Sequence, residues 1–144
     1  MKRLSDVNIL VALVAERCAQ HAPVRRWVEG LPADDKVCIS RPVQMGLVRL
    51  LCTEAVMGPD TLRLPQAWGV YARLLASGRF AFAFEPEGLD ACWADFCLPF
   101  RQSPKIVMDA YLAAFAVAGG YKLVTLDRAF GQFEELEWEM PGTA

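Results

Sequence analysis

Residues 103–127 read SPKIVMDAYLAAFAVAGGYKLVTLD, an apolar helical pattern that runs into a short apolar strand. Ser103 suits a helix N-cap, Pro104 suits the first turn, and Gly119-Gly120 supplies a C-terminal stop. The residues that follow, 121–126, are typical of a buried strand. The stretch therefore predicts a helix joined directly to a strand, which is the repeating unit of an α/β fold.

The rest of the chain continues this alternation. Further strands are predicted at residues 2–5, 36–40 and 80–84, with an edge strand at 136–140, and helices at 8–17, 21–30, from 42 to the stop at 58–59, 65–76 and 89–98. Strands that alternate with helices pair mostly in parallel. We therefore expect a single domain over residues 1–144, a three-layer α/β/α sandwich with a mostly parallel four- to five-stranded sheet.

Composition narrows the class of protein. The chain is 54% hydrophobic and 22% charged, which favours some apolar surface committed to another chain, a homodimer or a tight protein partner. A net charge of -2 argues against a generally basic surface that coats nucleic acid, but it leaves room for a local basic stripe.

The cysteines and the apolar runs indicate the compartment. The five cysteines show no paired C-x-x-C spacing, so reduced thiols and a cytoplasmic protein fit better than a disulfide framework. A zinc site is disfavoured because His21 is the sole histidine and lies apart from Cys92 and Cys97. No apolar run approaches the roughly 18–20 residues of a membrane span, so we expect no membrane association.

Three aspartates stand in unusual places. Asp6 follows the first predicted strand, Asp127 follows the strand at 121–126, and Asp109 is the sole charged residue between Ile106 and Ala118. An unpaired buried carboxylate costs several kcal/mol or takes up a proton. Because the carboxyl ends of parallel strands meet at one edge of a sheet, we expect the three aspartates to converge on a shared cation.

Each aspartate also has a plainer interpretation. Asp6 could cap the helix that begins near Asn8, and Asp127 could be an ordinary turn or cap residue. Asp109 would need a buried salt bridge, with Lys105 one turn earlier as the available partner.

The motifs together resemble a known family. Asp6-Val7-Asn8, the segment MDAYL at 108–112 and Thr125-Leu126-Asp127 resemble the PIN domain family of nucleases, and ISRPVQMGLVRL at 39–50 is similar to one branch of VapC-type toxins. The resemblance covers nearly the whole chain. It implies an endoribonuclease dependent on Mg²⁺, for which Mn²⁺ can substitute, acting as the toxin of a type II toxin–antitoxin pair with a cognate antitoxin.

The resemblance also implies roles for particular residues. A hard cation such as Mg²⁺ takes oxygen ligands and keeps several waters, so three aspartates suffice. Expected roles are catalysis and metal binding for Asp6, Asp109 and Asp127, orientation of a carboxylate or water for Asn8, Thr125 and Gln44, and contact with RNA phosphate for Arg101 and Lys105.

One position departs from the family pattern. Many members carry a glutamate six residues after the serine matched by Ser40, and this chain has Gly46 there. Glu54 or a water bridged by Gln44 could substitute. The departure keeps open an alternative function, a catalytically silent PIN-like module that binds protein or RNA. A response-regulator receiver fits poorly, because no paired acid lies near the first strand and Lys122 precedes Asp127.

The remaining arginines and aromatic residues are expected to serve the surface and the core. Arg41, Arg49 and Arg128 could line an RNA track, although a solvated surface role is the plainer interpretation for each. Packing is expected for the alternating Phe80, Phe82 and Phe84 and for the tryptophans Trp27, Trp68, Trp93 and Trp138.

Overall fold

The computed structural model describes residues 1–100 and 103–142. Its strands are β1 (Lys2–Ser5), β2 (Lys36–Ile39), β3 (Phe80–Phe82), β4 (Lys122–Val124) and β5 (Trp138–Glu139). Its α-helices are α1 (Val7–Val14), α2 (His21–Glu29), α3 (Arg41–Leu51), α4 (Glu54–Met57), α5 (Leu64–Ala76), α6 (Leu89–Cys97) and α7 (Ile106–Gly119). Short 3-10 helices are η1 (Gly58–Asp60), η2 (Leu98–Phe100) and η3 (Arg128–Gln132).

The five strands form one sheet in the order β3-β2-β1-β4-β5, and every pairing is parallel. In the register, Leu4 of the central strand pairs with Cys38 on one side and with Leu123 on the other. The carboxyl ends of all strands therefore lie at the same edge of the sheet, as the sequence predicted.

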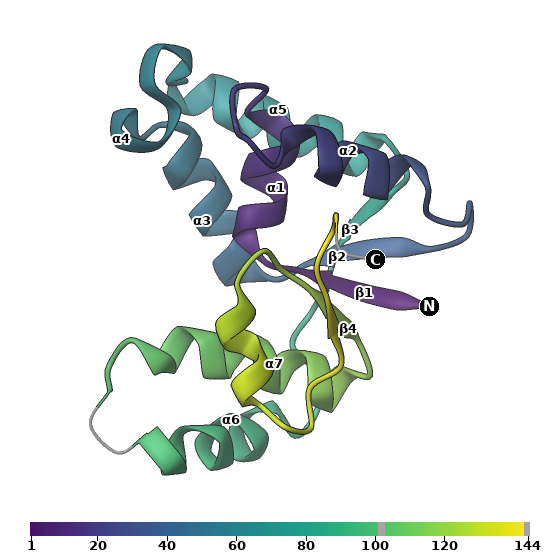
Figure 1. Ribbon diagram of the computed structural model, residues 1–144, viewed down its shortest axis with the longest axis vertical. Coiled ribbons are helices and arrows are strands. Elements are labelled where there is room, and N and C mark those ends of the chain that lie inside the picture. The colour runs from purple at the N-terminus through teal and green to yellow at the C-terminus, as the bar shows by residue number, and fades with distance from the viewer. Residues whose placement is uncertain (101–102, 143–144) are drawn as a thin grey trace.

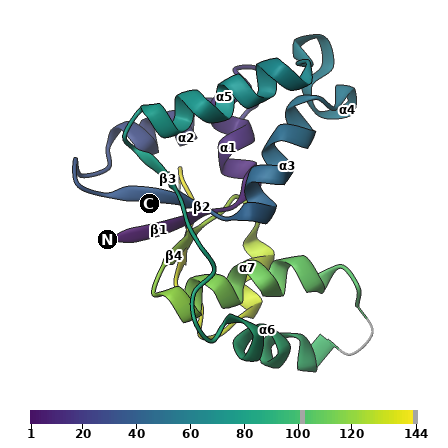
Figure 2. The same ribbon diagram turned by 180° about the vertical axis from the view of Figure 1, so that it is seen from behind.

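Helices cover both faces of this sheet (Figures 1 and 2). Helices α1, α2, α3 and α5 pack together on one face, and α6 and α7 pack against each other on the opposite face. This arrangement confirms the predicted three-layer α/β/α architecture. Among the described helices, none combines the length and the apolar character needed to cross a bilayer.

Several helix and strand boundaries differ from those predicted from the sequence. The first helix ends at Val14, because Ala15 is already extended and Arg17 instead pairs with Asp60 at 3.2 Å. The predicted helix from residue 42 divides into α3 and α4, and between them the Thr53 hydroxyl donates to the Arg49 carbonyl at 2.7 Å. The edge strands β3 and β5 are shorter than predicted, because each has a partner on one side alone.

Helix α7 forms the centre of its layer. Residues 110–116 are all buried, so this helix is apolar on every side, as expected for a helix covered by the sheet and by another helix. It begins at Ile106, whose amide donates to the Ser103 carbonyl at 3.2 Å, and it ends at Gly120 with φ of 71°. A left-handed conformation favours glycine, so the predicted stop at this position is confirmed.

The amino-terminal part of the sheet carries a network of paired charges. Arg3 donates from Nε to Glu139 Oε1 at 2.8 Å and from Nη1 to Asp35, and Lys122 Nζ lies 3.4 Å from Glu139 Oε2. Burial disfavours the charged guanidinium, but its hydrogen bonds to Asp35 and Glu139 outweigh this and raise the pKa of Arg3. Each of these carboxylates is therefore compensated by a cation.

Replacement of Phe115 by Ala tests how much the buried part of α7 contributes to stability. Phe115 is 0% exposed, so Phe115→Ala should lower the free energy of unfolding by about 3–5 kcal/mol through lost burial and a residual cavity. Phe84 is 81% exposed, so the matched control Phe84→Ala should change it by less than about 0.5 kcal/mol. Urea denaturation followed by circular dichroism measures both, and equal effects would contradict the assigned core.

Candidate active site

The candidate site lies where β1 and β4 end side by side. The amide of Asp6 donates to the carbonyl of Val124 at 2.9 Å, which extends the parallel pairing past the last residues of both strands. Continuing the register from Leu4 and Leu123 puts Asp6 level with Thr125. Residues 119 positions apart in the sequence are thus held next to each other by backbone pairing.

Three groups hold the carboxylate of Asp6. The Thr125 hydroxyl donates to Oδ2 at 2.7 Å, the Asn8 amide donates to the same oxygen at 3.2 Å, and the Val7 backbone donates to Oδ1 at 2.7 Å. The last bond makes Asp6 the N-cap of α1. The capping role and the site role are therefore compatible, because capping occupies one oxygen and the other oxygen lies against Thr125.

Asn8 and Thr125 also fix the loop after β4. Asn8 Oδ1 accepts from the Leu126 amide at 3.1 Å, and Asn8 Nδ2 lies 3.4 Å from the Thr125 hydroxyl oxygen. The same Thr125 oxygen accepts from the Asp127 amide at 3.0 Å. Since Thr125 is 0% exposed, these bonds are shielded from water and hold the loop rigidly.

Asp127 begins the short helix η3. Its Oδ1 accepts from the Ala129 amide at 2.9 Å, which is the cap interaction that the plainer interpretation requires. Asp127 is exposed to solvent, and its Oδ1 accepts the hydrogen bond from the Ala129 amide. As with Asp6, a capping role positions the carboxylate and leaves oxygen lone pairs for another ligand.

Asp109 reaches the site from the opposite layer, in the first turn of α7. Burial raises the pKa of its carboxyl, and the negative charges of Asp6 and Asp127 raise it further. Burial likewise raises the pKa of Asp6, against the hydrogen bonds from Thr125 and Val7, and the charge of Asp127 adds to the rise. The three aspartates are thus close enough to repel one another.

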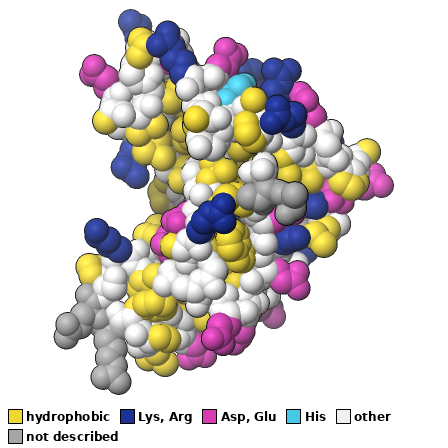
Figure 3. All heavy atoms as spheres, viewed as in Figure 1, with side chains coloured by type: hydrophobic (Ala, Val, Ile, Leu, Met, Phe, Trp, Pro, Cys, Tyr) yellow, Lys and Arg dark blue, Asp and Glu magenta, His cyan; other side chains and the backbone are white. Residues whose placement is uncertain are grey.

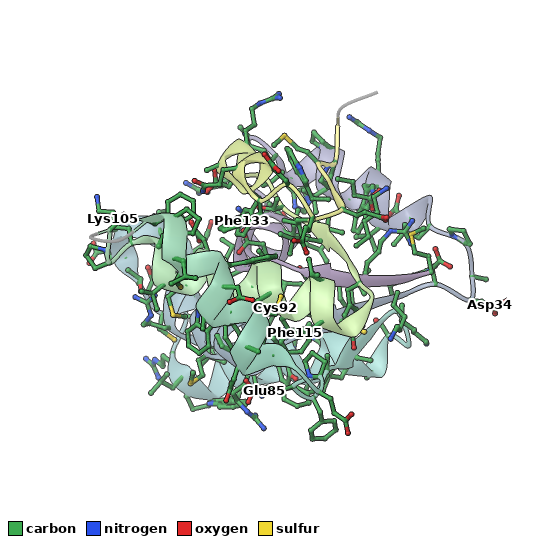
Figure 4. The ribbon with its side chains drawn as sticks, turned by 90° about the horizontal axis from the view of Figure 1, so that it is seen from below. Asp34, Glu85, Cys92, Lys105, Phe115 and Phe133 are labelled. Carbon is green, nitrogen blue, oxygen red and sulfur yellow. The ribbon has the colours of Figure 1, made fainter. Side chains whose placement is uncertain are left out.

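The salt bridge considered for Asp109 is not formed. In residues 1–100 and 103–142, no cation lies within ion-pair distance of any of the three aspartates. Lys105 is exposed at the start of α7, and Figure 4 shows it at one end of the molecule. Arg101, the other residue expected to contact RNA, lies outside the described residues.

A hydrated divalent cation fits this set of groups. The donors are hard carboxylate oxygens that repel each other, and Mg²⁺ needs one or two direct carboxylates with water completing its shell. Across the part of the chain that the structure describes, no three His, Cys, Asp or Glu side chains are close enough to enclose an ion by themselves. The fit is therefore to a cation that keeps part of its water shell.

Gly46 is explained by packing. A Cβ at this position would lie 3.3 Å from Cγ2 of Val7, so the absence of a side chain lets α3 approach α1 closely. Gln44 is directed elsewhere, since its Oε1 accepts from Arg41 and it lines a groove with residues of α5. Glu54 is exposed on α4. Among the described residues, Gln44 forms no hydrogen bond with the three aspartates.

Ser40 is a further polar residue at the carboxyl edge of the sheet. The sequence analysis used it solely to locate Gly46 in the family pattern. Ser40 is 0% exposed, and its hydroxyl has no hydrogen-bond partner among the described residues. Continuing the register from Leu4 and Cys38 puts it level with Asp6 on the neighbouring strand. A serine directly after a buried strand was the available signal, because that is where parallel sheets present polar groups.

Comparison with known proteins gives a family and named relatives. A family model described as "PIN domain" matches residues 4–136. Ribonuclease VapC41 from Mycobacterium tuberculosis is 40% identical over 140 residues, which is 93% of this chain and 94% of that protein. Ribonuclease VapC37 from the same organism is 28% identical over 140 residues, 96% of each chain.

Solved structures share the fold. The crystal structure of VapBC2 from Rickettsia felis bound to a DNA fragment from their promoter aligns with a TM-score of 0.74 and 16% identity, covering 98% of this chain and 99% of that chain. The structure of VapC20, a sarcin-ricin loop cleaving toxin from Mycobacterium tuberculosis, aligns with a TM-score of 0.67 and 17% identity, covering 92% and 94%.

Burial of Asp109, together with the negative charges of Asp6 and Asp127, predicts a pH-dependent effect of Asp109→Asn. Because the folded-state pKa of Asp109 is raised, its ionised form destabilises the folded protein at neutral pH, and protonation relieves this as pH falls through that pKa. In chelator, Asp109→Asn should therefore be more stable than wild type at pH 7, and the difference should shrink toward pH 4. Thermal unfolding measures this, with Asp34→Asn on an exposed turn as the control. An equal gain at both pH values would contradict the raised pKa of Asp109.

Proposed function

The chain belongs to the PIN domain family, and from that membership we propose that it is a divalent-metal-dependent endoribonuclease. It acts in the cytoplasm as the toxin of a type II toxin–antitoxin pair, with residues 1–144 forming one nuclease domain. The observation that carries the proposal is the set of hydrogen bonds by which Thr125 joins Asp6 to the loop of Asp127, at a site where no cation among the described residues pairs with Asp6, Asp109 or Asp127. Relatives that are named ribonucleases support the reaction class.

Mg²⁺ is the expected cofactor, with Mn²⁺ able to replace it, and Asp6, Asp109 and Asp127 are the residues that would hold it. When bound, such an ion polarises a phosphodiester oxygen, lowers the pKa of water and neutralises charge in the transition state. The carboxylates are then stabilised in their ionised form, so the cost of keeping them together is offset by the ligand.

The side chains around the aspartates have positioning roles. Thr125 and Asn8 hold one oxygen of Asp6 and join it to the loop that carries Asp127. The chain uses backbone amides for the remaining orientation, at Val7 for Asp6 and at Ala129 for Asp127. Preorganised carboxylates need no rearrangement when substrate arrives, which is where such sites gain most of their rate.

RNA and protein partners are part of the proposal. Lys105 at the exposed start of α7 is suited to contact RNA phosphate, and Arg101 precedes it in the chain. Toxin–antitoxin complexes among the structural neighbours, such as FitAB bound to an IR36 DNA fragment at a TM-score of 0.65, support a cognate antitoxin. A homodimer is proposed because Met45, Leu64 and Trp68 leave 51–59% of their surfaces exposed on α3 and α5.

Substitution of the aspartates tests the reaction. Asp6→Asn and Asp109→Asn should each lower Mg²⁺-dependent cleavage of single-stranded RNA by about 10²–10³-fold or more, because each removes charge that binds the cation. Initial rates on a fluorescently labelled oligonucleotide, with and without chelator, measure this. The control Asp34→Asn lies at the end of the molecule opposite Lys105 (Figure 4) and should cleave like wild type.

The alternative function gives a different pattern. A catalytically silent module would show no cleavage by wild type and no shift in thermal midpoint on addition of Mn²⁺. A genuine metal site should stabilise wild type by about 2.7 kcal/mol at a ligand concentration 100 times Kd, and the Asp6→Asn variant by less.

A further inference from the structure

A cavity of about 400 Å³ is lined by two indoles and by Arg128, the residue that follows Asp127 in the chain. The indoles are those of Trp27 from α2 and Trp138 from β5. The sequence predicted that all four tryptophans serve packing. Trp27 and Trp138 do pack against the core, but both keep partly exposed surface beside this cavity.

The cavity is built on the same short helix that carries a candidate catalytic carboxylate. Asp127 caps η3, and Arg128 is the first residue of that helix. Gly131, also in η3, lies so close to Trp138 that a Cβ there would be 3.4 Å from Cζ2 of the indole. The orientation of Trp138 and the position of Asp127 therefore depend on one structural element.

The charges around the cavity suit a polyanion that carries aromatic groups. Glu139 would repel phosphate, but Arg3 at 2.8 Å and Lys122 at 3.4 Å compensate its charge. Arg128 is exposed, and its guanidinium forms no ion pair with the described residues. Figure 3 shows basic, acidic and hydrophobic side chains next to one another near the centre of the face that is also seen in Figure 1.

We propose that this cavity binds one nucleobase of the RNA substrate, next to the phosphodiester that is cleaved. The inference rests on the proposed ribonuclease function and adds a subsite to it. Trp27 and Trp138 supply aromatic faces for stacking, and Arg128 contacts the phosphate between the bound base and the aspartates. Single-stranded RNA is recognised in this way because its bases are free to stack on aromatic side chains while cations hold the backbone.

The test measures RNA binding separately from cleavage. A short single-stranded RNA is titrated into Asp6→Asn protein, and tryptophan fluorescence and anisotropy of a label on the RNA are followed. Trp27→Ala and Trp138→Ala in this background should weaken binding about 5- to 100-fold, the loss expected from one stacked base. Trp138→Phe should restore most of the affinity, because it keeps an aromatic face.

Phe84→Ala is the matched control, since Phe84 is an aromatic residue that is 81% exposed and does not line this cavity. It should bind RNA like its parent. In otherwise wild-type protein, Trp138→Ala should raise KM more than it lowers kcat. Circular dichroism and urea midpoints identify Ala variants that fail to fold. Trp27→Leu and Trp138→Leu, which keep apolar bulk but lack an aromatic ring, then carry the comparison.

RNA affinity that is unchanged in folded Trp27→Ala and Trp138→Ala, or in their Leu counterparts, would overturn the subsite even if Asp6 and Asp109 prove essential for cleavage. Unchanged RNA affinity with weakened binding of the purified antitoxin would also overturn it, and would assign the cavity to protein docking. Cleavage that survives Asp6→Asn would instead refute the proposed function, while the binding titration would still decide whether the indoles hold a base.

Discussion

The active edge of this protein depends on the hydrogen bonds that join Asp6 at the end of β1 to Thr125 at the end of β4. The buried Thr125 hydroxyl donates to Asp6 at 2.7 Å and accepts from the Asp127 amide at 3.0 Å, so one side chain positions two carboxylates. Backbone pairing between Asp6 and Val124 supports this arrangement. These bonds orient the carboxylates, but no cation among the described residues pairs with them. Burial, with a further contribution from the neighbouring negative charges, raises the pKa values of Asp6 and Asp109.

Two parts of the sheet differ in whether their carboxylates are paired with cations. Toward the amino-terminal part, Arg3 bridges Asp35 and Glu139, and each carboxylate has a cation. At the carboxyl edge, carboxylates gather without one among the described residues. The proposed function accounts for this difference, because a bound cation would compensate the second group of carboxylates, whereas ion pairs within the protein compensate the first.

Packing also shapes the chemistry of the site. Gly46 stands where the resemblance led us to expect a glutamate, and a Cβ there would lie 3.3 Å from Cγ2 of Val7 on the neighbouring helix. The close approach of α3 to α1 and the missing acid are therefore one feature. Gln44, expected to compensate, is instead bonded to Arg41 on the α5 side of the helix. The helical position of Gln44 was predictable, whereas the direction of its amide depended on which helix packs beside it.

The sequence by itself determined the local elements and the identity of the acidic residues. Apolar patterning predicted α7, the stop at Gly120 and the strand that precedes Asp127, because these follow from short-range propensity and backbone sterics. Tertiary structure alone decided the strand order, the bond between Asp6 and Thr125, and the cavity between Trp27 and Trp138. Each of these joins residues far apart in the chain, and no local pattern encodes which distant segments become neighbours.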